Sequence, residues 1–159
     1  MTSRHASTRV AFITGGNSGI GLAIALALAR AGMDVAIFAR RADRNAAARA
    51  LIEAEGVRCL PITGDVTDEA AVRQAIVQTV ETLGGLHYGV NNAGAMQPVT
   101  ALSDLPVEEY TRQFDVNVKG VFLGTRHMIR AMANNGGGAI CNIASTGGLI
   151  PRAGQVAYA

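Results

Sequence analysis

The sequence lacks a strong net charge of either sign. Fourteen basic and twelve acidic residues leave a formal net charge of +2, which is too small to indicate a nucleic acid or an acidic membrane surface as a partner. Charged residues are scarce at 16%, whereas hydrophobic residues make up 49%. This balance is typical of a folded globular chain, and 159 residues are enough for one domain with a hydrophobic core.

Cysteine and histidine are also scarce, and they show no ligand pattern. Cys59 and Cys141 each lie in an apolar run, which predicts reduced thiols packed in the interior. His5, His87 and His127 are far apart in the sequence. The spacing therefore indicates neither a metal site nor a disulfide framework, and nothing indicates secretion.

No segment has the pattern of a signal peptide or a membrane span. The first nine residues, "MTSRHASTR", contain no apolar stretch. The run "GIGLAIALALARAGMDVAIFA" is interrupted by Arg30 and Asp34, and its uncharged part is too short to cross a bilayer. A buried helix followed by a buried strand explains this run better. We therefore expect a cytoplasmic protein with no membrane partner.

The chain alternates short apolar runs with longer amphipathic ones. The expected strands span residues 9–14, 34–39, 57–62, 86–93 and 138–145, and the expected helices span 18–31, 44–54, 68–83 and about 106–134. Thr67 is the expected N-cap of the third helix, and Pro61 favours a sheet edge for the third strand. This alternation predicts an α/β fold of the doubly wound Rossmann type, with a parallel sheet covered on both faces and a single domain over 1–159.

A glycine-rich turn, "TGGNSGIG", follows the first strand and opens the first helix. Gly15, Gly19 and Gly21 have the spacing that lets a backbone approach a pyrophosphate closely at a helix N-terminus. A plain strand-to-helix turn is the alternative. The strand before the turn and the helix after it favour dinucleotide binding.

The end of the second strand bears on the choice of cofactor. A carboxylate there would accept a hydrogen bond from a ribose 2′-hydroxyl and favour NAD(H). The strand instead ends in Ala39, followed by Arg40 and Arg41. Arginine can pair with a 2′-phosphate, so we expect NADP(H) to be preferred, with NAD(H) possible. The alternative is that these arginines are simply exposed on a solvated helix start.

These segments and others resemble the short-chain dehydrogenase/reductase family. The turn is similar to the family's cofactor signature, "GDV" (64–66) to the segment after its third strand, and "NNAG" (91–94) to the segment after its fourth. Asn117 in "DVNVKG", Ser145 and Tyr158 are similar to the family's catalytic residues, and the thirteen-residue gap between the last two fits. The pattern resembles the 3-oxoacyl-carrier-protein reductase and glucose dehydrogenase type.

The resemblance implies an oxidoreductase that transfers hydride between a nicotinamide and a small-molecule carbonyl or alcohol substrate. Tyr158 would transfer the proton, Ser145 would hold the substrate oxygen, and Asn117 would hold a water that relays protons. The implied cofactor-binding residues are Gly15, Asn17, Ser18, Gly19, Ile20, Gly21, Arg40, Asp65, Val66, Asn91, Ala93 and Gly94. Purely structural roles remain open for Asn117 as a partner of a nearby carbonyl, for Ser145 as a loop residue, and for Asn91 and Asn92 as caps of the fourth strand.

The family pattern extends beyond the printed sequence. It implies a lysine four positions after Tyr158 and two further strands, seven in all, whereas the sequence ends at Ala159 with five. We therefore expect a C-terminally incomplete chain that is inactive by itself, and a homo-oligomer for a full-length form, paired partly through the long helix. Two alternatives stay open: a non-catalytic dinucleotide-binding or interaction module, and a fragment without independent function.

Overall fold

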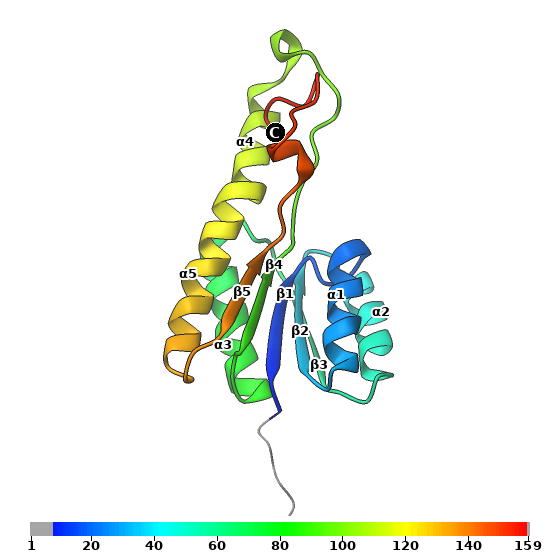
Figure 1. Cartoon of the computed structure of the whole chain (residues 1–159), viewed down its shortest axis with the longest axis vertical. Coiled ribbons are helices and arrows are strands. Elements are labelled where there is room, and N and C mark those ends of the chain that lie inside the picture. Colours follow the sequence, from blue (N-terminus) through cyan, green and yellow to red (C-terminus); the bar gives the residue numbers. More distant parts are fainter. Residues whose placement is uncertain (1–7, 159) are drawn as a thin grey trace, which may run out of the picture.

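A five-stranded parallel sheet forms the centre of the molecule (Figure 1). The computed structural model describes residues 8–158. The strands are β1 (Val10–Thr14), β2 (Asp34–Ala39), β3 (Cys59–Thr63), β4 (Tyr88–Asn91) and β5 (Ala139–Asn142), and they lie in the order β3-β2-β1-β4-β5. All neighbouring pairs are parallel, so the expected α/β Rossmann-type fold is confirmed.

Helices cover both faces of the sheet. They are α1 (Gly19–Arg30), α2 (Ala42–Glu53), α3 (Glu69–Leu83), α4 (Val107–Phe114) and α5 (Gly120–Ala133), with a π-helical turn at Asp115–Lys119 and 3-10 turns at Leu102–Asp104 and Thr146–Gly148. One face packs against α1 and α2, and the other packs against α3 and α5. The long helix expected from about 106 to 134 is present as α4, the π-helical turn and α5 in succession.

The core has two layers because neighbouring strand residues point to opposite faces. Phe12 packs with Phe38 and Met128 on the α3/α5 face, whereas Ile13 packs with Ile37 on the α1/α2 face. Both layers exclude solvent, since all five side chains are at most 1% exposed. The continuous apolar character of the central strands follows from this double coverage.

The two sheet edges differ in their burial. Pro61 lies in β3, which is an edge strand as expected. Within the described residues, β5 is the other edge, and Cys141 is exposed there. The expectation that both thiols are packed is therefore wrong for Cys141, because its strand has a neighbour on one side only. Cys59 is buried, and this burial raises the pKa of its thiol to about 12.

Two helix starts differ from expectation by one or two residues. The N-cap of α3 is Asp68 and not Thr67, because the Asp68 carboxylate accepts hydrogen bonds from the backbone N–H of Ala70 and Ala71. Helix α2 begins at Ala42, two residues earlier than expected.

The first seven residues, which carry His5 and most of the segment without the pattern of a signal peptide, lie outside the described part of the chain. Among the described helices, none is long and apolar enough to cross a membrane.

Candidate active site

The glycine turn leaves room for a close approach because Gly15 and Gly21 carry no side chains. Gly15 has a φ of +67°, and a Cβ there would stand 2.9 Å from Asn92 Nδ2. A Cβ at Gly21 would stand 2.3 Å from the Gly15 carbonyl oxygen. Gly19 has a φ of +53° and faces open space. The turn therefore brings the N-terminus of α1, with its unpaired N–H groups, to the mouth of a cleft.

Asn17 fixes this turn against the next helix. Its side chain is 8% exposed, and its Nδ2 donates to Asn45 Oδ1 at 2.7 Å. Asn45 in turn donates to the Ala39 carbonyl oxygen at the end of β2. Ser18 is the N-cap residue of α1, but its side chain makes no capping hydrogen bond. The Ser18 hydroxyl, which donates only a long bond to Asn17 Oδ1 at 3.4 Å, is thus available at the cleft.

A cleft of about 260 Å³ lies beside the carboxyl ends of the strands, where β1 lies between β2 and β4. This is the place where open α/β sheets bind ligands. Eight of the expected cofactor residues line it: Gly15, Asn17, Ser18, Arg40, Asp65, Val66, Ala93 and Gly94. Asn92 and Arg112 line it as well, and no pattern in the sequence predicts Arg112 there.

Arg40 and Asp65 face each other across one end of this cleft. The Arg40 side chain is 76% exposed, and its Nη1 lies 4.0 Å from Asp65 Oδ2. Asp65 Oδ1 accepts from the Thr67 N–H, which orients the carboxylate. Val66 is buried against α5, where a Cβ at Gly120 would stand 2.9 Å from Val66 Cγ2. Because the Arg40 side chain is mostly exposed and its contact with Asp65 is long, the Arg40 guanidinium can reach an anion in the cleft.

The two asparagines after β4 have different surroundings. Asn91 is 2% exposed, and its Nδ2 donates to Thr125 Oγ1 and Asn142 Oδ1. Its side chain does not line this cleft or the hollow that adjoins it. The structure therefore does not bring Asn91 to the other expected cofactor residues. Asn92, by contrast, donates to the carbonyl oxygens of Thr14 and Gly15 and holds the glycine turn against the end of β4.

The three expected catalytic residues line one cavity. A hollow of about 450 Å³ is bordered by Asn117, Ser145 and Tyr158, together with Ile20 from the start of α1. It shares Asn92, Ala93, Gly94 and Ala95 with the first cleft, so the two spaces adjoin along the loop after β4. Residues from the glycine turn, the π-helical turn and the chain after β5 thus meet at one place.

Ser145 and Tyr158 are held by the short turn that follows β5. Ser145 Oγ accepts from the Gly147 N–H at 3.1 Å, which leaves the hydroxyl hydrogen free to donate. Gly147 lies under the ring of Tyr158, since a Cβ there would stand 3.1 Å from Tyr158 Cε1. Any larger residue at 147 would displace the tyrosine ring.

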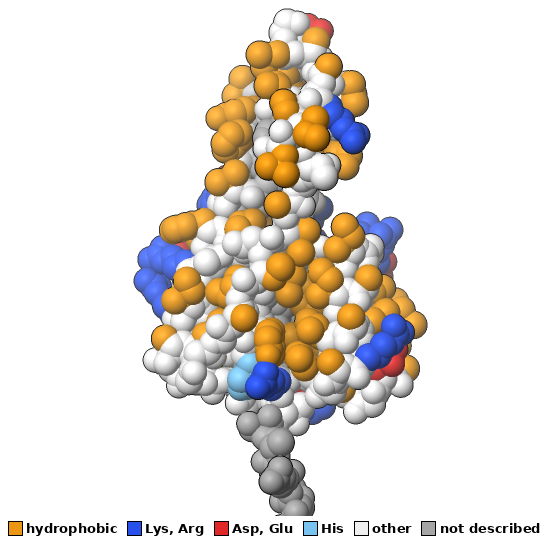
Figure 2. All heavy atoms as spheres, viewed as in Figure 1, with side chains coloured by type: hydrophobic (Ala, Val, Ile, Leu, Met, Phe, Trp, Pro, Cys, Tyr) orange, Lys and Arg blue, Asp and Glu red, His pale blue; other side chains and the backbone are white. Residues whose placement is uncertain are grey.

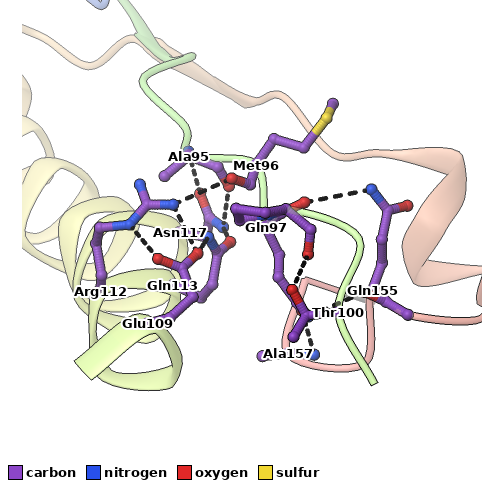
Figure 3. A network of polar contacts seen from close by, with 12 residues as sticks. Ala95, Met96, Gln97, Thr100, Glu109, Arg112, Gln113, Asn117, Gln155 and Ala157 are labelled. Carbon is purple, nitrogen blue, oxygen red and sulfur yellow. Dashed lines mark hydrogen bonds and ion pairs between the residues drawn. The ribbon is translucent and has the colours of Figure 1, made fainter. Parts of the chain in front are cut away.

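Asn117 makes three hydrogen bonds with the protein itself (Figure 3). Its Oδ1 accepts from the Ala95 N–H at 2.8 Å, and its Nδ2 donates to the Ala95 carbonyl oxygen and to Gln113 Oε1, both at 2.9 Å. Both amide hydrogens are therefore committed. The expected water relay stays a prediction, and a water could bind this side chain only at the second lone pair of Oδ1.

Glu109 and Arg112 extend this network along α4. Arg112 donates two hydrogen bonds to the Glu109 carboxylate and one to the Met96 carbonyl oxygen. The hydrogen bonds from Arg112 and Gln113 hold the pKa of Glu109 below its ordinary value. The loop after β4 is thus held by the π-helical turn at residue 95 and by α4 at residue 96. Within residues 8–158, no group of three histidine, cysteine or acidic residues could hold a metal ion.

The fold, with its cleft beside the glycine turn and the adjoining hollow, defines an α/β protein with a crevice of the kind that binds a dinucleotide. The chain matches the short chain dehydrogenase family over residues 9–159. It belongs to this family.

Individual proteins and solved structures are also similar to this chain. General stress protein 39 of Bacillus subtilis is 40% identical over 138 residues, which cover 86% of this chain and 48% of that protein. NAD+-bound xylitol dehydrogenase has a TM-score of 0.92 at 30% identity, covering 96% of this chain and 59% of that one. An actinorhodin polyketide ketoreductase variant with NADPH has a TM-score of 0.90 at 33% identity, covering 95% and 58%. The chain thus spans only about half to three fifths of the length of these proteins.

Proposed function

We propose that this chain carries the cofactor crevice and the proton-transferring residues of a nicotinamide-dependent oxidoreductase that interconverts a carbonyl and an alcohol. The observation that carries the proposal is the single cavity that Asn117, Ser145 and Tyr158 share beside the glycine-lined cleft. These residues are far apart in the sequence and come from three different segments. A fold-maintaining role alone gives no reason for a hydroxyl pair to face an open hollow next to that cleft.

The residues present fit a bound dinucleotide. Side chains at Gly15 or Gly21 would fill the turn, whereas glycine leaves the N-terminus of α1 open to a pyrophosphate. When bound, the nicotinamide would supply or accept the hydride. Arg40 and Arg41 line the cleft and support a preference for NADP(H), because a guanidinium pairs well with a phosphate. NAD(H) remains the second candidate, since one similar structure carries NAD+ and another NADPH.

The chain's own residues then handle the proton and the substrate oxygen. The free hydrogen of the Ser145 hydroxyl donates to that oxygen and holds it in the cavity. The Tyr158 hydroxyl gives its proton to the oxygen during reduction and takes it back during oxidation. An ordinary tyrosine has a pKa near 10, so a nearby cation is needed for work near neutrality. The one lysine of the printed sequence, Lys119, pairs with Asp115 at 3.8 Å.

The finer assignments also belong to this proposal. We infer one domain over 1–159, a small-molecule substrate, and a type close to the 3-oxoacyl-carrier-protein reductases and glucose dehydrogenases. A full-length form would be a homo-oligomer. Hydrophobic side chains gather on the upper part of the molecule, where α4 lies (Figure 2). Large apolar side chains are exposed along α4, the π-helical turn and α5, namely Tyr110, Phe114, Val118, Phe122 and Ile129, and they support pairing through this helix.

The test is an activity assay on a full-length form that carries the C-terminal residues of the longer relatives. We expect oxidation of NADPH with some member of a panel of ketones, and reduction of NADP+ with the matching alcohol. The alternative is a non-catalytic dinucleotide-binding module. Tight binding of either cofactor without turnover on any ketone or alcohol, in a protein shown to be folded, would favour that alternative.

A further inference from the structure

Gln97 is a buried polar side chain that the proposed chemistry does not use. It is 1% exposed and is among the largest fully buried side chains of the described residues. It lies in the loop after β4, beyond the residues that line the two clefts. A buried primary amide costs free energy unless its donors and acceptor are paired, so its partners indicate why it is there.

Both ends of the Gln97 amide bind the turn that leads to Tyr158. Its Nε2 donates to the Gly154 carbonyl oxygen at 3.1 Å, and its Oε1 accepts from the Ala157 N–H at 2.9 Å. One side chain thus joins two backbone groups, one at the start and one near the end of the turn 154–158. Figure 3 shows Gln97 beside this turn. Ala157 directly precedes Tyr158, so the hydrogen bond to its N–H fixes the Val156–Ala157 peptide, one residue before the tyrosine.

Other contacts hold the two segments at this distance. The Thr100 N–H also donates to the Gly154 carbonyl oxygen, at 2.9 Å. Gly154 has a φ of +77°, and a Cβ there would stand 2.7 Å from Val99 Cγ1. The Tyr158 N–H closes the turn by donating to the Gln155 carbonyl oxygen at 3.1 Å. The stretch 97–100 and the turn 154–158 therefore pack as one unit.

The same loop is fastened at its other end to the helix that carries Asn117. The Asn117 side chain pairs with both backbone groups of Ala95, and Arg112 binds the Met96 carbonyl oxygen. A series of residues linked by hydrogen bonds and by the chain itself thus runs from the π-helical turn through residues 95–97 to the turn before Tyr158. Gln97 is the last member of this series before the tyrosine.

We propose that Gln97 is a positioning residue, whose side-chain amide sets the place of the Tyr158 hydroxyl relative to Ser145 and Asn117. This inference rests on the proposed function, because it gives Gln97 a role in turnover through Tyr158. It requires an amide at this position: an apolar side chain of the same length fills the space but leaves the Ala157 N–H unpaired and the Gly154 carbonyl oxygen with the Thr100 N–H as its one donor.

The test compares Gln97→Met with Gln155→Met in a full-length form. Methionine keeps the length of glutamine in both variants. Gln155 lies on the same turn, but its side chain makes only one long bond, at 3.5 Å to the Gln97 carbonyl oxygen. A displacement of about 1 Å can cost about a hundredfold in rate. We therefore expect Gln97→Met to lower kcat about 10- to 100-fold with the cofactor Kd within about twofold of the parent, and Gln155→Met to stay within about twofold in both.

A double-mutant cycle with Tyr158→Phe separates positioning from a general structural effect. If Gln97 acts only through the tyrosine hydroxyl, Gln97→Met has no further effect on the residual rate of Tyr158→Phe. A further loss of similar size would overturn the proposal. Turnover of Gln97→Met equal to that of the parent would overturn it too, provided that Tyr158→Phe is inactive. An active Tyr158→Phe would instead contradict the proposed function, whatever Gln97→Met does.

Hydrogen exchange of the unsubstituted protein keeps the inference testable if Gln97→Met does not fold. The Ala157 N–H is expected to exchange at least tenfold more slowly than in an unstructured peptide, because Gln97 Oε1 accepts from it. Exchange of Ala157 at the unstructured rate would contradict the proposal directly.

Discussion

Gly21 lies so close to Gly15 that a Cβ at residue 21 would stand 2.3 Å from the Gly15 carbonyl oxygen and 2.4 Å from Asn92 Nδ2. The first turn of α1 therefore touches the backbone of the glycine turn and the Asn92 side chain of the loop after β4. This contact brings the N-terminus of α1 up to the cleft, and it explains why a glycine is needed at residue 21 for packing and not only for its conformational freedom.

Replacing Gly21 by alanine is expected to harm both stability and cofactor binding. Overpacking of this kind costs about 1–3 kcal/mol, and the turn must move away from Asn92 to relieve it. We expect the free energy of unfolding in urea to fall by that amount and the cofactor Kd to rise at least tenfold. Gly32→Ala is the matched control, since Gly32 has a φ of +79° with open space around it and lies outside the cleft. It should cost about 1 kcal/mol and leave the cofactor Kd unchanged. Equal effects of the two variants on Kd would contradict the role given to Gly21.

Arg40→Ala is expected to reduce the preference for NADP(H). Hydrogen bonds to a charged group contribute about 1.5–3 kcal/mol, so the ratio of the two Kd values should shift about 10- to 100-fold toward NAD(H). Arg44→Ala serves as the control, because Arg44 is exposed on α2 and does not line the cleft. Calorimetric titration of both cofactors into the three proteins provides the measurement. A parent protein without preference, or an unchanged ratio in Arg40→Ala, would sink the NADP(H) proposal.

Tyr158→Phe and Ser145→Ala separate the two hydroxyls of the cavity. Phenylalanine keeps the ring against Gly147 and removes only the proton-transferring group, so a full-length form should lose turnover by at least a thousandfold while its cofactor Kd stays within twofold. Ser145→Ala removes one hydrogen bond to the reacting oxygen and should cost about a hundredfold in kcat. Steady-state kinetics with ketone and NADPH measure both. Near-full activity of Tyr158→Phe would show that the proton comes from another group.

The two thiols are expected to differ in reactivity and in their effect on stability. At pH 8 Cys141, which is exposed, should react with a disulfide reagent at once, whereas Cys59 should react only on unfolding.

The pKa of Cys59 is raised to about 12, above its ordinary value near 8.5. The folded state therefore keeps this proton where the unfolded chain releases it, and the stability that burial of the neutral thiol contributes is complete below about pH 8.5 and lost as the pH rises toward about 12. Urea unfolding between pH 7 and 11 should show this decline, and Cys59→Ala should lessen it. An unchanged decline in Cys59→Ala would assign it to other groups.

Much of the fold could be predicted because its causes are local. Apolar runs separated by glycine mark the strands, and the position of Pro61 at an edge follows from its missing N–H. The errors came from neighbours distant in the sequence. Cys141 lies in an apolar run, but its exposure depends on which strand packs beside β5. The task of Gln97 depends on partners 57 and 60 residues away, and no spacing rule reveals them. Thr67 and Asp68 are both good N-cap residues, and only the backbone geometry chooses between them.

The 159-residue chain by itself is expected not to catalyse hydride transfer. Lys119, the one lysine of these 159 residues, lies next to Asp115 in the π-helical turn and does not line the cavity of Tyr158, so it does not supply the nearby cation that a tyrosine needs near neutrality. Strand β5 has exposed residues and, within residues 8–158, pairs only with β4, which also predicts poor solubility because an unpaired edge invites aggregation. The glycine turn and its cleft are intact, so weak cofactor binding should persist.

The experiment is to purify the chain, confirm that it is monodisperse, and assay NADPH oxidation with a panel of ketones beside a full-length form. We expect less than a thousandth of the full-length rate. Comparable turnover by the short chain would show that Tyr158 transfers its proton without a lysine beside it, which contradicts this prediction.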